Sequence, residues 1–189
     1  MLTRKTLIAA IVLIAAIASI AFVIWQSNKA GPLAWPCEKN CDRASGRVTA
    51  TLERGERLDW AHIFLTNRSE KTAQIEAIRL LAESARITEA RVAGPGRTLG
   101  GGILRADSDV TDWGVQLLPA YKATVPPVTS DPQHRGVVLV LTVTSMSDSI
   151  AEINGVEVTY RTGGTVYTDR FLSELIICPR SQLKAPECR

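Results

Sequence analysis

The sequence predicts an all-β protein, an antiparallel β-sandwich of about eight strands preceded by one transmembrane helix. Two observations predict this architecture. After residue 46, apolar and polar residues alternate with a period of two, in runs of about 6–9 residues separated by turn sequences. Before that, residues 7–25 form an apolar run without a charged residue, Pro or Gly. The first pattern is typical of short half-buried strands, and the second of a membrane-spanning helix.

The apolar run is predicted to be an uncleaved signal anchor. A helix over residues 7–25 covers about 28 Å, close to the hydrocarbon thickness of a bilayer. The run continues to Trp25, past the small-residue pairs that could imitate a cleavage site, which makes a cleaved signal the lesser alternative. Residues 1–6 hold two basic residues and residues 26–36 only one. The positive-inside rule therefore keeps residues 1–6 in the cytoplasm and places the remaining domain outside the plasma membrane.

Composition limits the function of the exported part. The chain carries 22 basic and 19 acidic residues, two of the basic ones before the anchor, so the exported part is almost neutral. This balance indicates neither a nucleic-acid surface nor a polybasic lipid-binding patch. The exported part divides into a neck over residues 26–46, rich in Pro, Gly and Asn, a sandwich over residues 47–178 and a polar tail over residues 179–189. Its length suits a single domain.

Four cysteines, all in the exported part, predict two structural disulfides. Cys37 and Cys41 lie in the neck, whereas Cys178 and Cys188 lie at the end of the chain. Pairing neck with tail would close a loop of about 150 residues and stabilise the fold by up to about 5 kcal/mol, more than two local rings. Neck-to-tail pairing is therefore expected, in either of its two versions. The alternative is copper, zinc or thiol-redox handling by Cys37 and Cys41, although three residues separate them instead of the usual two.

Alternation and turn chemistry place the strands along the exported chain. The central strand is residues 136–145, which is apolar on both faces as far as Leu141, as in a strand covered on both sides. Gly163-Gly164 predicts a two-residue hairpin turn because glycine accepts positive φ. The other expected strands are residues 47–53, 60–67, 73–81, 84–92, 114–118, 153–161, 165–170 and the continuation 171–178, of which the pair in 73–92 also tolerates helix.

A long punctuated connection over residues 94–133 is a candidate for function, because loops of this length in a compact domain are often functional. It holds Trp113 and Tyr121, aromatic residues that could anchor a partner. The competing interpretation, which the sequence favours, is that both rings fill the core beneath the loop.

The C-terminal strands carry a resemblance to a known class. The hydrophobic strand 136–145, the Gly-x-x-x-x-Tyr run from Gly155 to Tyr160 and the Gly-Gly hairpin resemble bacterial Ig-like ectodomains. In particular, residues 153–178, INGVEVTYRTGGTVYTDRFLSELIIC, resemble the closing hairpin of small actinobacterial single-pass membrane proteins. The resemblance implies an Ig-like sandwich and a membrane location, and it transfers no functional residue. The cysteines lie outside the strand core, unlike the pin of true immunoglobulin domains.

No catalytic or metal motif is visible. His62 is expected on the solvent face of a strand and His134 at a loop tip, and neither belongs to a known motif. Asp107, Asp109 and Asp112 lack the spacing of a helix-loop-helix calcium site, and no cofactor is expected. Asn67-Arg68-Ser69 is formally a glycosylation acceptor. The sequence thus predicts a non-enzymatic binding or adaptor module for another envelope protein, with the metal or redox role of Cys37 and Cys41 as the alternative.

Overall fold

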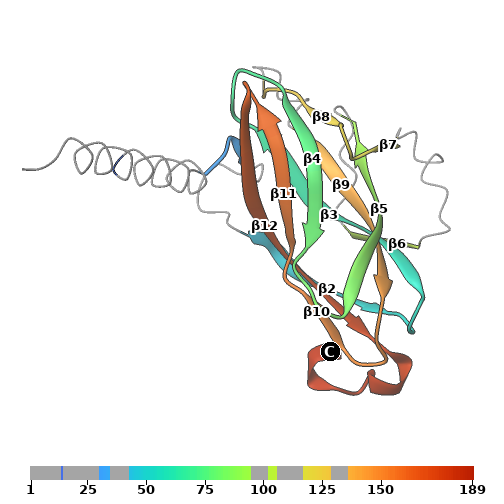
Figure 1. The fold of residues 1–189 in the computed structure, drawn as a ribbon. Coiled ribbons are helices and arrows are strands. Elements are labelled where there is room, and N and C mark those ends of the chain that lie inside the picture. The colour runs from blue at the N-terminus through green and yellow to red at the C-terminus, as the bar shows by residue number, and fades with distance from the viewer. Residues whose placement is uncertain (1–13, 15–29, 35–42, 95–101, 106–116, 129–135) are drawn as a thin grey trace, which may run out of the picture. The chain divides into compact units, whose positions relative to one another are not determined.

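The structure is a computed structural model that describes residues 14, 30–34, 43–94, 102–105, 117–128 and 136–189. The chain divides into two compact units, Met1–Ala30 and Gly31–Arg189. The described residues of the second unit form two β-sheets and two short 3₁₀ turns (Figure 1). The predicted all-β class is confirmed for this unit.

The first sheet has the order β1-β3-β9-β5-β7, with β6 also paired to β3. Its pairs are all antiparallel. The strands of this sheet are β1 (Leu33–Ala34), β3 (Arg57–Asn67), β5 (Ala85–Ala93), β6 (Gly102–Arg105), β7 (Leu117–Pro119) and β9 (Val137–Ser145).

The second sheet has the order β10-β12-β11-β4-β8, with β2 paired to β12. Its strands are β2 (Arg43–Thr51), β4 (Ala73–Leu80), β8 (Thr124–Val125), β10 (Ala151–Ile153), β11 (Val156–Thr162) and β12 (Thr165–Cys178). The β2–β12 pair is parallel, which corrects the expectation of a purely antiparallel sandwich. The chain closes with η2 (Arg180–Gln182) and η3 (Pro186–Cys188).

Strands overlap all the expected ranges, and residues 165–178 form one continuous strand instead of two. Of the expected strand 114–118, only residues 117 and 118 are described, and both belong to β7. Four short strands, β1, β6, β8 and β10, were not expected. Each has two to four residues, too few for a period of two to emerge above the surrounding turns. The β1 and β2 strands also show that parts of the predicted neck belong to sheets.

The β9 strand occupies the centre of the first sheet and is buried along its whole length, as its apolar sequence predicts. Leu139 and Leu141 pack into the main core between the sheets together with Trp60 and Tyr160. Val138 and Val140, on the other face of the strand, belong to a second apolar cluster. The two faces of one strand therefore bury two separate apolar surfaces.

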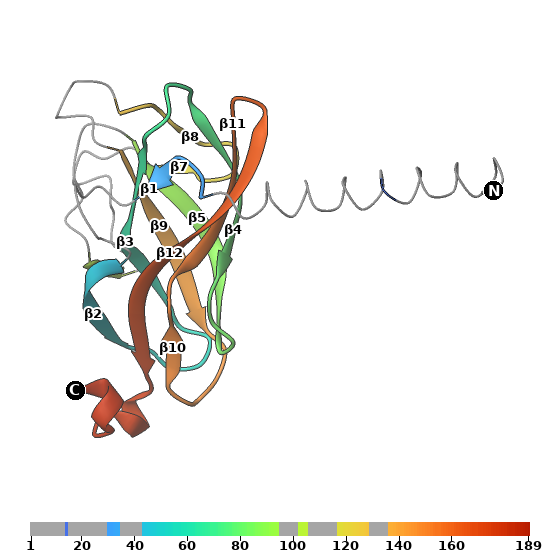
Figure 2. The ribbon, with the colours of Figure 1, turned by 90° about the vertical axis from the view of Figure 1, so that its left-hand side faces the viewer.

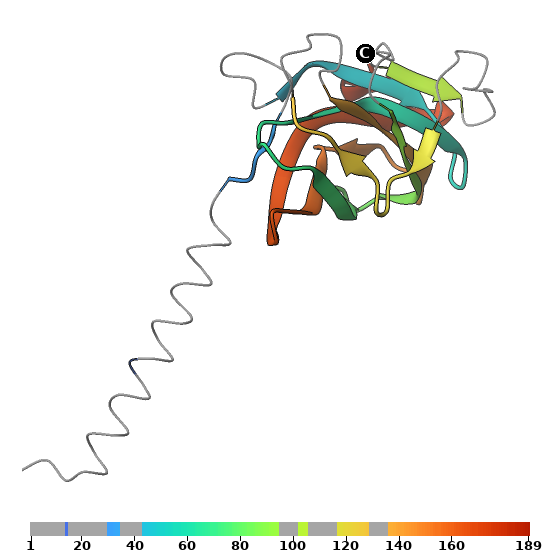
Figure 3. The same cartoon turned by 90° about the horizontal axis from the view of Figure 1, so that it is seen from above.

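The sandwich has two distinct ends, visible in Figure 2, and Figure 3 looks down on one of them. One end, which we call the strap end after residues 31–34, carries β1, β7 and β8. It also carries the β3–β4 turn (residues 68–72) and the β11–β12 turn (residues 163–164). The opposite end, which we call the knot end after the disulfide loop of residues 178–188, carries that loop and the turns β2–β3, β4–β5 and β9–β10. Each end gathers segments that are far apart in the sequence.

Candidate functional site

At the strap end, residues 31–34 are clamped onto the sandwich by a buried tyrosine. The Tyr160 hydroxyl accepts a hydrogen bond from the Leu33 amide (3.1 Å) and donates one to the Asp169 carboxylate (2.5 Å). The other Asp169 oxygen accepts from the Gly31 amide (3.1 Å). Burial and the neighbouring carboxylate raise the pKa of Tyr160 far above its usual range, which keeps the hydroxyl protonated. We call residues 31–34 the strap.

Glycine is required at the start of the strap because of this clamp. A Cβ atom at Gly31 would lie 1.8 Å from the Tyr160 hydroxyl oxygen. Beyond it, Leu33 pairs with Asn67 of β3, and the Arg68 amide donates to the Pro32 carbonyl (2.9 Å). The point at which the chain enters the sandwich is therefore fixed by both sheets.

Asn67 organises the strap end and is no glycosylation acceptor in the folded protein. Its side chain is fully buried and donates to the carbonyls of Lys71 (2.8 Å) and Val125 (2.9 Å). Its Oδ1 accepts from the Ser69 amide (3.0 Å), and its carbonyl accepts from the Val128 amide (2.8 Å). A glycan attached to this amide would displace these contacts.

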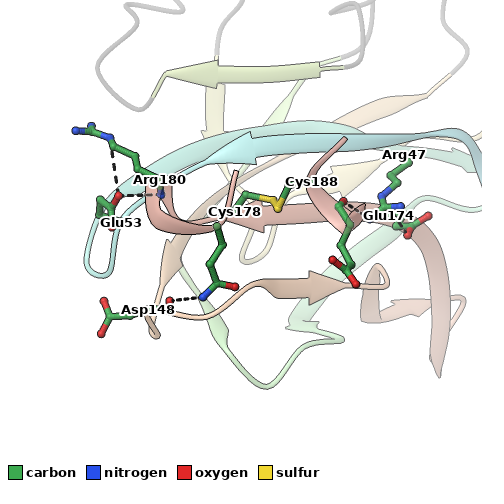
Figure 4. Close-up of a disulfide and its surroundings, with 9 residues drawn as sticks. Arg47, Glu53, Asp148, Glu174, Cys178, Arg180 and Cys188 are labelled. Carbon is green, nitrogen blue, oxygen red and sulfur yellow. Dashed lines mark hydrogen bonds and ion pairs between the residues drawn. A yellow bond between two sulfur atoms is a disulfide. The ribbon is translucent and has the colours of Figure 1, made fainter. Parts of the chain in front are cut away.

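At the knot end, a disulfide joins Cys178, the last residue of β12, to Cys188, with Cα atoms 6.0 Å apart (Figure 4). The loop between them forms the two 3₁₀ turns, and polar contacts hold it against neighbouring turns. The Arg180 amide donates to the Glu53 carboxylate (3.0 Å), and the Gln182 side chain donates to the Asp148 carbonyl (3.1 Å). We call this loop, residues 178–188, the knot.

The expected neck-to-tail disulfide is wrong, because Cys178 and Cys188 bond to each other. Pro179 starts a turn directly after β12, and the 3₁₀ turns bring the two cysteines together over a separation of 10 residues. Loop-closure entropy favours a long loop only if the fold brings its ends together, and here β12 directs its end into a local ring. Cys37 and Cys41 lie outside the described residues.

An open groove of about 870 Å³ lies between the knot, β10 and the β4–β5 turn. Its lining includes three exposed carboxylates, Glu83, Glu152 and Glu187, and none of them forms an ion pair with another described residue. The basic side chain in the lining is Arg79, whose guanidinium is bound to Glu157 at 2.9 Å. That contact, followed by one from Arg170, lowers the pKa of Glu157. The Arg47 guanidinium also donates to the main-chain carbonyl of Glu187. The negative charge of the groove is therefore that of three carboxylates without an ion pair to another described residue.

No pattern in the sequence brings the groove carboxylates together. Glu83 lies in the turn after β4, Glu152 in β10 and Glu187 in the knot, and only the strand pairing and the disulfide make them neighbours. Solitary acidic residues on turns and edges are ordinarily solvated surface positions.

Tyr121, predicted to line a partner-binding loop, points into solvent. Its side chain is 67% exposed, which overturns the expectation that the ring fills the core. The turn that carries it is rigidly held, because the Lys122 amide donates to the Ile75 carbonyl and the Ala120 amide to the Ala90 carbonyl, both at 2.9 Å. Lys122 has φ +66° and its ammonium lies 5.4 Å from the Tyr121 ring centre. The turn thus exposes the Tyr121 ring and the neighbouring Lys122 ammonium to solvent.

The structure pairs His62 with Ser173 across the two sheets. A register shift between Trp60 and Ile63 turns His62 away from the predicted solvent face, and its Nδ1 lies 2.9 Å from the Ser173 hydroxyl. Burial lowers the pKa of His62. A serine beside a histidine resembles a nucleophile and its base, but Ser173 is only 3% exposed. The two side chains therefore form a hydrogen bond that links the two sheets.

A second buried polar cluster lies on the outer face of the first sheet. Asp59 on β3 accepts from Thr142 of β9 (2.6 Å) and from the Arg91 guanidinium of β5 (2.5 Å). Asp59 is 1% exposed, and each of its two carboxylate oxygens accepts one of these hydrogen bonds. This arrangement joins β3, β5 and β9 through side-chain hydrogen bonds.

Several predicted site residues lie outside the part of the chain that the structure describes: Trp113, His134, Asp107, Asp109, Asp112, Cys37 and Cys41. Within the described residues, no group of three or more His, Cys, Asp or Glu could hold a metal ion. Residues 7–25, apart from Ile14, also lie outside, and among the described residues no helix is long and apolar enough to cross a bilayer. The anchor and the role of Cys37 and Cys41 stay predictions.

A comparison with models of known protein families finds no match for this chain. No curated protein matches it either.

Proposed function

We propose that the chain is a binding or adaptor module without catalytic activity, held by residues 7–25 outside the plasma membrane. Its sandwich is proposed to be of the Ig-like type, as the resemblance of residues 153–178 implies. The structural disulfide at the knot supports an oxidising compartment, since such bonds persist there and are rare in the cytosol.

The acidic groove is the observation that carries the proposal. Three carboxylates from separate elements face one open groove, and the guanidinium of Arg79 is already paired with Glu157. Such a surface attracts a basic segment and speeds its association by electrostatic steering. The proposed partner is an envelope protein that presents an exposed segment rich in Lys or Arg.

The absence of catalytic activity is supported by the burial of the candidate nucleophile. Ser173 is 3% exposed, so a substrate carbonyl could not approach its hydroxyl without opening the space between the sheets. General-base catalysis requires the reacting group within hydrogen-bond reach of both residues.

The test is photo-crosslinking in intact cells that express the full chain. A photoreactive amino acid replaces Glu152 in the groove or Thr168, an exposed residue on β12, as a control. We expect a specific membrane or envelope protein from position 152 and none from position 168. The charge reversal Glu83→Lys should reduce that product, whereas Glu70→Lys, at an exposed position in the β3–β4 turn outside the groove, should leave it unchanged. Identical products from both positions, or none from position 152, would contradict the proposal.

A further inference from the structure

We propose that the strap end of the sandwich rests on the lipid headgroups of the membrane. The inference depends on the predicted anchor, and therefore on the proposed function. It assigns a lipid surface to the end of the domain that carries Tyr121, leaving the acidic groove at the other end for a protein partner.

The first argument is the length of chain between anchor and strap. Residues 26–30 separate the end of the apolar run from Gly31, where the clamp of Tyr160 and Asp169 begins. Even fully extended, five residues span no more than about 18 Å. Because the strap is fixed to both sheets, this length limits how far the strap can lie from the end of the apolar run.

The second argument is the distribution of exposed apolar side chains. Six large apolar side chains are exposed among the described residues of the sandwich unit, and four of them lie at the strap end. The turn of Tyr121 follows β7, and Val128 is bound to Asn67, the residue that pairs with the strap. The four residues and their exposed fractions are Leu118 45%, Tyr121 67%, Val128 42% and Val166 43%.

The third argument is the chemistry at this end. Tyrosine is enriched at headgroup level because its ring is apolar and its hydroxyl is polar, and lysine extends its ammonium from such a surface toward phosphate. Lys122 adjoins Tyr121, and Lys71 lies in the β3–β4 turn beside the β11–β12 turn, with its side chain next to Gly163. Two lysines on an apolar surface make a shallow interfacial contact, unlike a polybasic patch, which the composition does not indicate.

The experiment measures how close each end lies to the lipids. The full chain is placed in nanodiscs of phosphatidylcholine and phosphatidylglycerol that contain a headgroup-labelled nitroxide lipid. A fluorescent amino acid replaces Val128 at the strap end or Leu183, which is similarly exposed, in the knot. We expect strong quenching at position 128 and weak quenching at position 183.

The lysines are tested by Lys71→Gln combined with Lys122→Asn, since asparagine tolerates positive φ. Each removed charge should weaken the contact roughly fivefold in phosphatidylglycerol nanodiscs. Lys184→Gln in the knot is the matched control and should change nothing. Equal quenching at positions 128 and 183 would overturn the lipid contact. So would quenching at position 128 that is the same with and without the two lysine substitutions.

The outcomes separate this inference from the proposed function. If the full chain fails to enter nanodiscs, the anchor itself is wrong, and the proposed location fails with it. If the chain enters but quenching at position 128 is weak, only the lipid contact fails. A protein crosslinked from position 128 in intact cells would then identify a protein as the occupant of the strap end.

Discussion

At the scale of single residues, the partial burial of His62 makes stability depend on pH. Burial lowers the pKa of His62 in the folded chain below its ordinary value of 6.5. The unfolded chain therefore binds the proton more readily, and protonation favours unfolding. The contribution of His62 is complete above about pH 6.5 and is lost as the pH falls from there through the folded pKa.

We expect the free energy of unfolding to fall with decreasing pH below about 6.5. His62→Asn keeps a polar group near Ser173 but cannot titrate, so it should flatten that part of the profile. The measurement is denaturant unfolding of the full chain in detergent across this pH range. An unchanged slope in His62→Asn would show that another group causes the dependence.

The hydroxyl of Tyr160 allows an equally direct test. Tyr160→Phe removes the acceptor for the Leu33 amide and the donor to Asp169 while preserving the ring. We expect a loss of about 1–3 kcal/mol in the free energy of unfolding, because buried polar groups are left without partners. Amide hydrogen exchange at Leu33 should accelerate in the same variant.

Tyr167→Phe is the control for the strap. The Tyr167 ring stacks on Tyr160 with ring centres 5.7 Å apart, and this substitution keeps the stacking. If both variants released the Leu33 amide equally, the effect would not be specific to the Tyr160 hydroxyl, and the clamp would be contradicted.

At the scale of elements, the knot combines a short disulfide ring with contacts to two neighbouring turns. Replacing both Cys178 and Cys188 by serine removes the constraint on the unfolded chain. We expect a loss of about 2–3 kcal/mol in the free energy of unfolding, the value for a ring of this size in the loop-entropy model. Denaturant unfolding without reductant measures it, with Ser181→Ala in the same loop as the control.

The same double variant should weaken the acidic groove, because the knot carries Glu187 and forms one wall of it. The crosslink from position 152 should therefore decrease while the two sheets persist. If the crosslink kept its full yield with the disulfide removed, the knot would not contribute to the groove surface.

At the scale of the whole molecule, the two ends of the sandwich have different chemistry. The strap end exposes apolar side chains and lysines, and the knot end carries the acidic groove. An adaptor tethered by one end and binding by the other needs this arrangement. The proposed location requires the chain to cross the membrane once, with Arg189 outside.

We expect a reporter that needs disulfide formation, fused after Arg189, to be active, and a reporter that folds only in the cytosol to be inactive. Deleting residues 7–25 should reverse both results, because the deletion removes the export signal. Activity confined to the cytosol in the full chain would contradict the location, the groove partner and the lipid contact together.

The sequence by itself determined the class of the fold and the position of its long strands. Alternation in β3, β11 and β12, and the continuous apolar run of β9, are local patterns that follow directly from the two faces of a strand. The Gly163-Gly164 turn was equally readable, and both glycines have positive φ.

Only the tertiary structure decided the pairing of Cys178 with Cys188, the parallel β2–β12 pair, the exposure of Tyr121, the inward turn of His62 and the clamp of the strap. Each depends on contacts between residues brought together by sheet pairing, or on a register shift that no local pattern records. The groove carboxylates follow the same rule. The sequence identifies them as carboxylates, but only the folded chain brings them close together.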